Sequence, residues 1–120
     1  MATITPVGLS NAGSKPSWAA ITTGGDVVAN APGKTVVIEF DNQHNASITV
    51  AIAPTQTTAQ VDGVGSVTVP TRSVVAATTE PAVFKFKEGE KAAYLNASGQ
   101  FPITYTDGNT AMKVRAFYID

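Results

Sequence analysis

Hydrophobic residues alternate with polar or small residues along most of the chain, a pattern typical of half-buried β-strands. The alternation is clearest in two runs, formed by Val36, Ile38 and Phe40 and then by Ile48, Val50 and Ile52. The stretch between them, DNQHN at 41–45, is rich in Asn and Asp, which tolerate left-handed backbone and bond to their own main chain. We therefore predict that the two runs form a β-hairpin with this stretch as its turn.

Further segments of the same kind follow along the chain. They span residues 17–22, 66–69, 72–78, 82–87, 101–106 and 112–119. No segment keeps a helical period, and about eight short strands separated by turn residues are typical of a β-sandwich. The sequence thus predicts an all-β protein, a single β-sandwich or jelly-roll-like domain over residues 17–120. Its expected core consists of Val36, Ile38, Phe40, Ile48, Val50, Ile52, Phe84, Phe86, Ile103, Tyr105, Val114 and Ala116.

Residues 1–16 are predicted to form an extended N-terminal arm, because Pro and Gly interrupt their hydrophobic residues every few positions. Ile4, Val7 and Leu9 are costly to leave exposed, so we expect a partner to order them. That partner is either a surface to which the protein binds or a neighbouring subunit. As an equal alternative, the arm adds an edge strand to its own sandwich.

The low charge of the chain restricts the classes of partner. Only 14% of its 120 residues are charged and the formal net charge is −1, whereas about a quarter of the residues are charged in a typical soluble domain. Eight Lys and Arg scattered among nine acids form no basic face of the kind that binds phosphates. No run is long enough to span a bilayer, and the first residues lack a secretory signal. We expect no nucleic-acid or membrane partner, and synthesis in the cytoplasm without export.

The chain offers little for catalysis or metal binding. It has no Cys and a single His, so a metal would depend on His44 together with carboxylates and amides. Glu88 and Glu90 lie in a Gly-containing charged loop, where solvated acids are expected. The stretch 107–110 matches a turn better than a calcium loop, because no closing glutamate follows it. We predict no enzymatic activity, no cofactor and no metal site.

A series of turn and strand motifs runs through residues 17–120. It comprises GGD at 24–26, GKT at 33–35, SITVAI at 47–52, SVTVP at 66–70, EPAVFKF at 80–86 and ITY at 103–105, with Asn30, Asp41, Asn42, Tyr94 and Gly99 at intervals. The series resembles that of small β-sandwich proteins that decorate the capsids of tailed bacteriophages. The family often has a Pro-Phe pair where this chain has Pro81-Ala82-Val83-Phe84, and a glycine at Arg72, so this stretch is expected to turn differently.

The resemblance implies a non-enzymatic virion protein, a capsid decoration or cement protein that binds the outside of an assembled shell, often as a trimer. Its partner would be the major capsid protein, and its location the virion surface. Separately, outward Phe117 and Ile119 beside Lys113 and Arg115 predict self-association, most simply as a trimer. The candidate partner-binding residues are therefore Ile4, Val7, Leu9, Lys113, Arg115, Phe117 and Ile119.

A carbohydrate-binding or adhesin-like β-sandwich module is the alternative function. Trp18, Tyr94, Tyr105 and Tyr118 would then serve as platforms on which sugar rings stack. The alternation places Tyr105 and Tyr118 on core faces. A single Trp at the start of a strand is more often buried in the core than part of a contact. We therefore expect Trp18 in the core and favour the virion protein.

Overall fold

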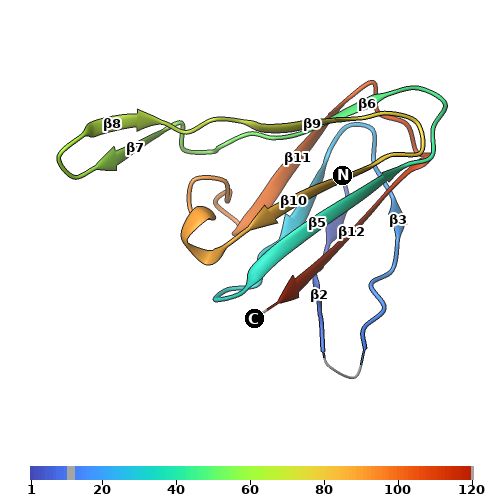
Figure 1. Ribbon diagram of the computed structural model, residues 1–120, viewed down its shortest axis with the longest axis horizontal. Coiled ribbons are helices and arrows are strands. Elements are labelled where there is room, and N and C mark those ends of the chain that lie inside the picture. Colours follow the sequence, from blue (N-terminus) through green and yellow to red (C-terminus); the bar gives the residue numbers. More distant parts are fainter. Residues whose placement is uncertain (11–12, 120) are drawn as a thin grey trace.

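The computed structural model describes residues 1–10 and 13–119 and shows an all-β protein whose two sheets face each other (Figure 1). The first sheet has the order β1-β4-β11-β6-β9, and these strands span Thr3–Ile4, Asp26–Ala29, Gln100–Thr106, Ile48–Ile52 and Arg72–Ala76. The second sheet has the order β10-β5-β12-β2, and its strands span Pro81–Phe86, Thr35–Asn42, Met112–Ile119 and Val7–Gly8. A short strand, β3 (Ala19–Ala20), also pairs with β12. The predicted all-β class is confirmed.

Two further strands form a hairpin of their own outside these sheets. They are β7 (Thr58–Val61) and β8 (Gly65–Thr68). Both are inserted between β6 and β9, which are antiparallel neighbours in the first sheet. The insert, here called the projecting hairpin (residues 57–69), therefore extends beyond the sandwich at one end of the molecule (Figure 1). A one-turn 3-10 helix, η1 (Glu88–Glu90), follows β10.

The core lies between the two sheets and contains the residues predicted from alternation. All of the predicted core residues are buried except Tyr105, which is half-buried. The rings of Phe86 and Phe101 stack with their centroids 4.6 Å apart, and Phe40 meets Phe84 edge-on at 6.0 Å. Strand alternation places these rings on the inner faces, where their burial contributes to the hydrophobic stabilisation.

The predicted hairpin between residues 36–41 and 48–52 is wrong. Strand β5 pairs with β10 and β12, whereas β6 pairs with β9 and β11, so the two runs lie in different sheets. The polar stretch between them is a corner that carries the chain from one sheet to the other. The buried side chain of Asn42 holds this corner, because its Nδ2 donates to the carbonyl oxygens of Ala46 and Ala76 at 3.0 and 2.8 Å.

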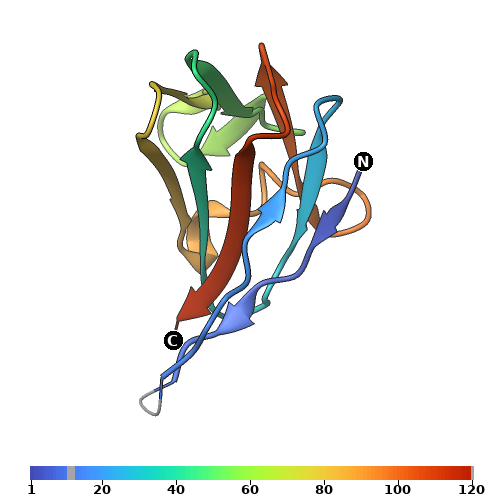
Figure 2. The same ribbon diagram turned by 90° about the vertical axis from the view of Figure 1, so that its right-hand side faces the viewer.

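The N-terminal segment lies along its own sandwich and joins both sheets (Figure 2). Strand β1 pairs in parallel with β4 of the first sheet, and β2 pairs in parallel with β12 of the second. Pro6 is buried between these two short strands. Gly8 allows the close approach of β2, because a Cβ atom there would lie 2.7 Å from the ring of Tyr118. Of the alternatives for this segment, the structure thus has the added edge strand.

Candidate protein-binding surfaces

The outer face of the second sheet carries hydrophobic side chains at the end where β12 meets β2. In the register of the sheet, Phe117 lies between Val37 of β5 and Val7 of β2. Two residues further along the chain, each segment has another hydrophobic residue. These residues are Ile119 on β12 and Leu9 just after β2, and both are exposed. The N–H of Leu9 donates to the carbonyl of Tyr118 at 3.1 Å, which holds the segment after β2 beside β12. Four predicted partner-binding residues, Val7, Leu9, Phe117 and Ile119, are thus brought together.

An arginine and a tryptophan occupy the middle of the same outer face. The Nε atom of Arg115 donates to the Glu39 carboxylate at 2.6 Å. Its guanidinium also lies 4.1 Å from the centre of the Trp18 ring, an attractive cation–π geometry. Trp18 is 40% exposed, so the prediction that it belongs to the core is wrong. Trp18 comes beside Arg115 because β3 runs antiparallel to β12 with Ala19 opposite Val114, and Trp18 directly precedes Ala19.

Two predicted partner-binding residues lie apart from this group or at its margin. Ile4 is half-buried on β1 and packs against the core, so it belongs to the first sheet rather than to the outer face. Lys113 stands on the outer face near the other end of β12, and its Nζ is 3.5 Å from the carbonyl oxygen of Thr110. At the edge strand β10, Val83 adds a 51% exposed hydrophobic side chain in register with Glu39. We call this surface, from Val83 through Arg115 and Trp18 to Phe117 and Leu9, the outer face.

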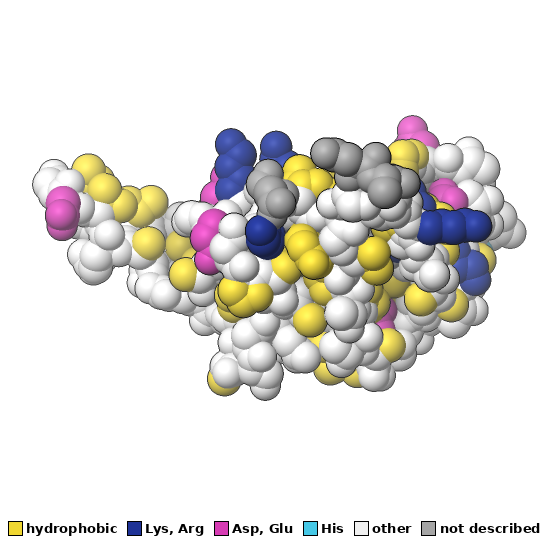
Figure 3. All heavy atoms as spheres, turned by 90° about the horizontal axis from the view of Figure 1, so that it is seen from below, with side chains coloured by type: hydrophobic (Ala, Val, Ile, Leu, Met, Phe, Trp, Pro, Cys, Tyr) yellow, Lys and Arg dark blue, Asp and Glu magenta, His cyan; other side chains and the backbone are white. Residues whose placement is uncertain are grey.

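The projecting hairpin is a second surface on which hydrophobic side chains are exposed. Val61, Val64 and Val67 are all exposed, and Val64 at the turn is the most exposed of them at 72%. Figure 3 shows the hairpin as a separate lobe with hydrophobic side chains and one acidic side chain. The turn closes by a hydrogen bond from the N–H of Val64 to the carbonyl of Val61. Gly63 and Gly65 flank its tip with positive φ, which glycine adopts without strain.

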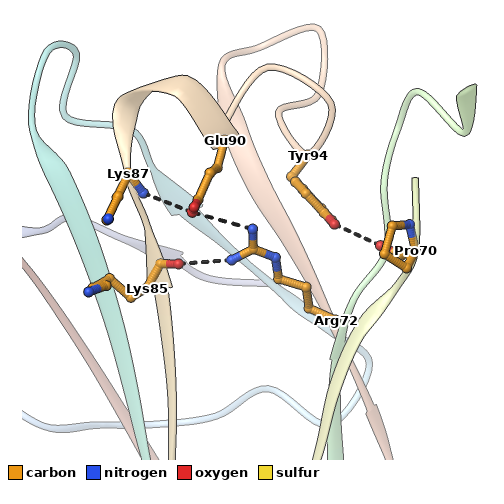
Figure 4. A network of polar contacts seen from close by, with 6 residues as sticks. All are labelled: Pro70, Arg72, Lys85, Lys87, Glu90 and Tyr94. Carbon is orange, nitrogen blue, oxygen red and sulfur yellow. Dashed lines mark hydrogen bonds and ion pairs between the residues drawn. The ribbon is translucent and has the colours of Figure 1, made fainter. Parts of the chain in front are cut away.

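Both legs of the hairpin are clamped to the sandwich at their base. On the first leg, the N–H of Thr55 donates to the carbonyl of Ala93 at 2.7 Å, and its hydroxyl donates to that of Leu95 at 2.6 Å. On the second leg, the buried Tyr94 donates its hydroxyl to the carbonyl of Pro70 at 2.7 Å (Figure 4). The base is therefore fixed by the loop that follows η1, although the tip is free of the sandwich.

Arg72 ties the base to the second sheet. Its guanidinium donates to the carbonyl of Lys85 at 2.8 Å and lies 3.4 Å from the Glu90 carboxylate (Figure 4). The same group lies over the rings of Phe86 and Tyr94, at 4.3 and 4.9 Å from their centres. Arg72 of β9 thus links the first sheet to β10 of the second sheet at the base of the hairpin.

The charged loop around η1 is more ordered than the predicted set of solvated acids. Lys91 is 1% exposed, and its Nζ donates to the carbonyl of Ala31 at 2.8 Å and to the Glu88 carboxylate at 2.7 Å. Glu88 is exposed, but the hydrogen bond from Lys91 lowers the pKa of its carboxyl. The hydrogen bond from the backbone of Lys87 likewise lowers the pKa of Glu90. This loop thus connects the base of the projecting hairpin to the 31–33 turn, where the N–H of Gly33 donates to the Glu88 carboxylate.

Asp26 is the most buried acid of the described residues and joins three segments. Its carboxylate accepts hydrogen bonds from the N–H groups of Ala2 and Thr22, each at 3.0 Å, and from the Tyr105 hydroxyl at 2.8 Å. Burial raises the pKa of Asp26, but these hydrogen bonds outweigh burial and hold it below its ordinary value. Burial and the bond to Asp26 raise the pKa of Tyr105. Because both of its oxygens accept hydrogen bonds, Asp26 has a structural role and holds these three segments together.

His44 lies in the corner after Asn42, where its backbone N–H donates to the Asn42 side chain at 3.0 Å. In residues 1–10 and 13–119, no three His, Asp or Glu side chains group closely enough to hold a metal ion.

Replacing His44 with Ala should change the free energy of unfolding by less than about 0.5 kcal/mol, because the imidazole holds no neighbouring strand in place. Urea unfolding measures this, and adding EDTA should leave the melting curve of the wild-type protein unchanged. The matched variant is Asn42→Ala in the same corner, which should cost about 1–3 kcal/mol because it strips hydrogen bonds from the carbonyls of Ala46 and Ala76. A melting curve that shifts with EDTA would contradict the assignment of His44 to a turn.

The projecting hairpin and its clamp were not predicted from the sequence. The sequence predicts a sandwich strand at 66–69 and no strand at 58–61, whereas the two segments pair with each other outside the two main sheets. The available signal was Asp62-Gly63 between two short runs that contain Val61 and Val67, a pair typical of hairpin turns. Small and polar residues in both runs weaken the alternation.

Comparison of the chain with protein-family models, with curated proteins and with solved structures finds no match. Within the part of the chain that the structure describes, no helix has the length and hydrophobicity to cross a membrane.

Proposed function

We propose that the protein is a non-enzymatic virion protein that binds the outer surface of an assembled bacteriophage capsid and stabilises it. The observation that carries the proposal is the composition of the outer face, where Trp18 and Arg115 stand between exposed hydrophobic residues. Trp and Arg are enriched among the residues that dominate protein–protein binding energy. Phe is enriched in interfaces as well, and Phe117 extends the same surface. The capsid as partner comes from the series of sequence motifs that resembles decoration proteins.

The arrangement of charges on the outer face fits a protein partner better than a nucleic acid. Arg115 is already paired with Glu39 at 2.6 Å, so it adds little net positive charge for phosphates. A role in holding shell subunits together, with the major capsid protein as partner, accounts for this arrangement.

The carbohydrate-binding or adhesin-like alternative is disfavoured by the aromatic residues themselves. Sugar stacking needs a ring face that is open to solvent. The guanidinium of Arg115 already lies over the Trp18 ring, Tyr94 is buried, and Tyr105 and Tyr118 are half-buried against the core.

Two valines on opposite faces provide the test. Capsids that lack the protein are mixed with purified chain, sedimented and analysed for bound protein. Val83→Asp should weaken co-sedimentation at least about tenfold, about 1.4 kcal/mol, because it places a charge in the contact. Val75→Asp is the matched control, since Val75 is 63% exposed on the outer side of the first sheet, and it should bind as the wild type does.

Failure of the wild-type protein to sediment with capsids would overturn the proposed function. Equal binding by the Val83→Asp variant and the wild type would leave the function but remove the outer face as its site.

A further inference from the structure

The projecting hairpin exposes three valines, Val61, Val64 and Val67. An isolated two-stranded hairpin is marginally stable in water, because it has no third element on which to bury a face. Here the tip lies away from the sandwich, and hydrogen bonds at Thr55 and Pro70 fix the direction of the base. Val64 is thus presented at a defined position rather than left to fold back, which is the pre-organisation that lowers the cost of binding.

A cavity on the other side of the molecule has the matching chemistry. It lies between the N-terminal segment and the edge of β12, in the gap that β2 and β3 leave along that strand. Its volume is about 260 Å³, and its walls include Ile4, Ser17, Ala19, Ala20, Val114 and Ala116. Small-molecule sites usually occupy roughly 300–1,000 Å³, so this cavity is better suited to an inserted side chain. None of the described residues that line it is charged.

We infer that the hairpin tip of one copy inserts Val64 into this cavity on a second copy of the chain. The two features lie toward opposite ends of the molecule in Figure 1, where the hairpin extends to the left and β2 and β3 lie to the right. The hairpin of one chain therefore cannot reach the cavity of the same chain. Each copy can instead insert its hairpin into the cavity of one neighbour and bind the hairpin of another. Such a head-to-tail contact generates a closed ring when the rotation between copies closes.

The polarity of the two surfaces is compatible with a second copy as the occupant. Val64 is uncharged and the cavity wall carries no charged residue, so inserting Val64 desolvates no charge within the cavity. The net charge of −1 per chain gives little repulsion between copies. In a ring, the contacts also act together, because each copy is held by two neighbours.

The absence of cysteine from the chain allows a direct test by disulfide trapping. A Val64→Cys variant is mixed under oxidising conditions with a Ser17→Cys variant, in which one exposed cavity residue is replaced by a near-isosteric one. The predicted contact brings the two sulfurs together, and disulfides form only where Cα atoms approach to roughly 7 Å or less. We expect a cross-linked heterodimer in a yield at least about fivefold above the control.

The control mixes Val64→Cys with Ser98→Cys, which places an exposed cysteine in the 96–99 turn instead of the cavity. Carrying Val64→Cys and Ser17→Cys on the same chain should give closed, cross-linked oligomers. Equal yields for Ser17→Cys and Ser98→Cys would overturn the inference.

A second variant separates this inference from capsid binding. Val64→Asp should abolish association of the purified protein in light scattering while its melting temperature stays that of the wild type, because Val64 is 72% exposed at the hairpin turn. An oligomer that survives Val64→Asp would overturn the hairpin contact. If Val64→Asp abolishes capsid binding but leaves the oligomer intact, the inference is overturned as well, because the hairpin would then contact the capsid instead of a second copy.

Discussion

Replacing Asp26 with Asn should lower the free energy of unfolding by about 2–3 kcal/mol at neutral pH. The carboxylate accepts from Ala2, Thr22 and Tyr105, and each of these groups is a donor. An Asn amide has one oxygen and one NH₂ group, so the NH₂ would face donors without an acceptor. Because Asp26 is 1% exposed, water cannot repair the mismatch.

The same residue should make stability depend on acid. Its pKa is lower in the folded protein than in the unfolded chain, so its contribution is complete above the unfolded value of about 4 and is lost as pH falls through the folded pKa. Between neutral pH and about pH 2, the free energy of unfolding should therefore fall further for the wild type than for the Asp26→Asn variant.

Urea unfolding of both proteins at pH 7 and at low pH measures the two effects. The matched control is Asp107→Asn, because Asp107 is exposed and its positive φ is one that Asn adopts readily. It should behave as the wild type at both pH values. If the Asp26→Asn variant is as stable as this control at pH 7, the three hydrogen bonds to Asp26 do not stabilise the fold as the geometry indicates.

Alternation predicted which residues are buried but not which strands pair. The period of Val36, Ile38 and Phe40 shows that one side of the strand faces a core, whichever sheet contains it. The pairing of β5 with β10 and β12 depends on residues 40 to 84 positions away along the chain. A polar stretch such as 41–45 favours a turn, and a hairpin turn and a corner between sheets use the same residue types. That is why the predicted hairpin was wrong although its strands were right.

The candidate surfaces were predictable where they lie on regular strands. Phe117 and Ile119 alternate with the core-facing Ala116 and Tyr118 in β12, so their outward direction follows from the sequence. Trp18 was misplaced because its surroundings are set by Arg115, which lies almost at the other end of the chain. Lys91 was expected in a solvated loop, since no local pattern reveals that Ala31 supplies a buried acceptor. Such long-range polar contacts depend on tertiary packing, which a local pattern does not report.

The two segments outside the central strands should differ sharply in what they contribute to stability. Deleting residues 1–9 removes Ala2 as a donor to Asp26, the packing of Ile4 and the buried Pro6. A hydrogen bond to a charged group is worth about 1.5–3 kcal/mol. The packing of Ile4 adds to this, while the entropy regained by a freed segment offsets part of the loss. We expect a net fall of about 2–4 kcal/mol and a melting temperature lower by roughly 10 °C.

Removing the projecting hairpin should have almost no such effect. The N–H of Val69 already donates to the carbonyl of Thr57 at 2.8 Å, so an Asn-Gly turn can join these two residues in place of 58–68. Because β7 and β8 pair with each other in a sheet separate from the two main sheets, the free energy of unfolding should stay within about 0.5 kcal/mol of that of the wild type. Thermal and urea unfolding of the two deletions, made side by side, compares a segment that completes its own sheets with one shaped for another molecule. An unchanged melt on loss of residues 1–9 would show that the N-terminal segment is not an integral edge of the sandwich. A large loss of stability on removal of the hairpin would show instead that it supports its own chain.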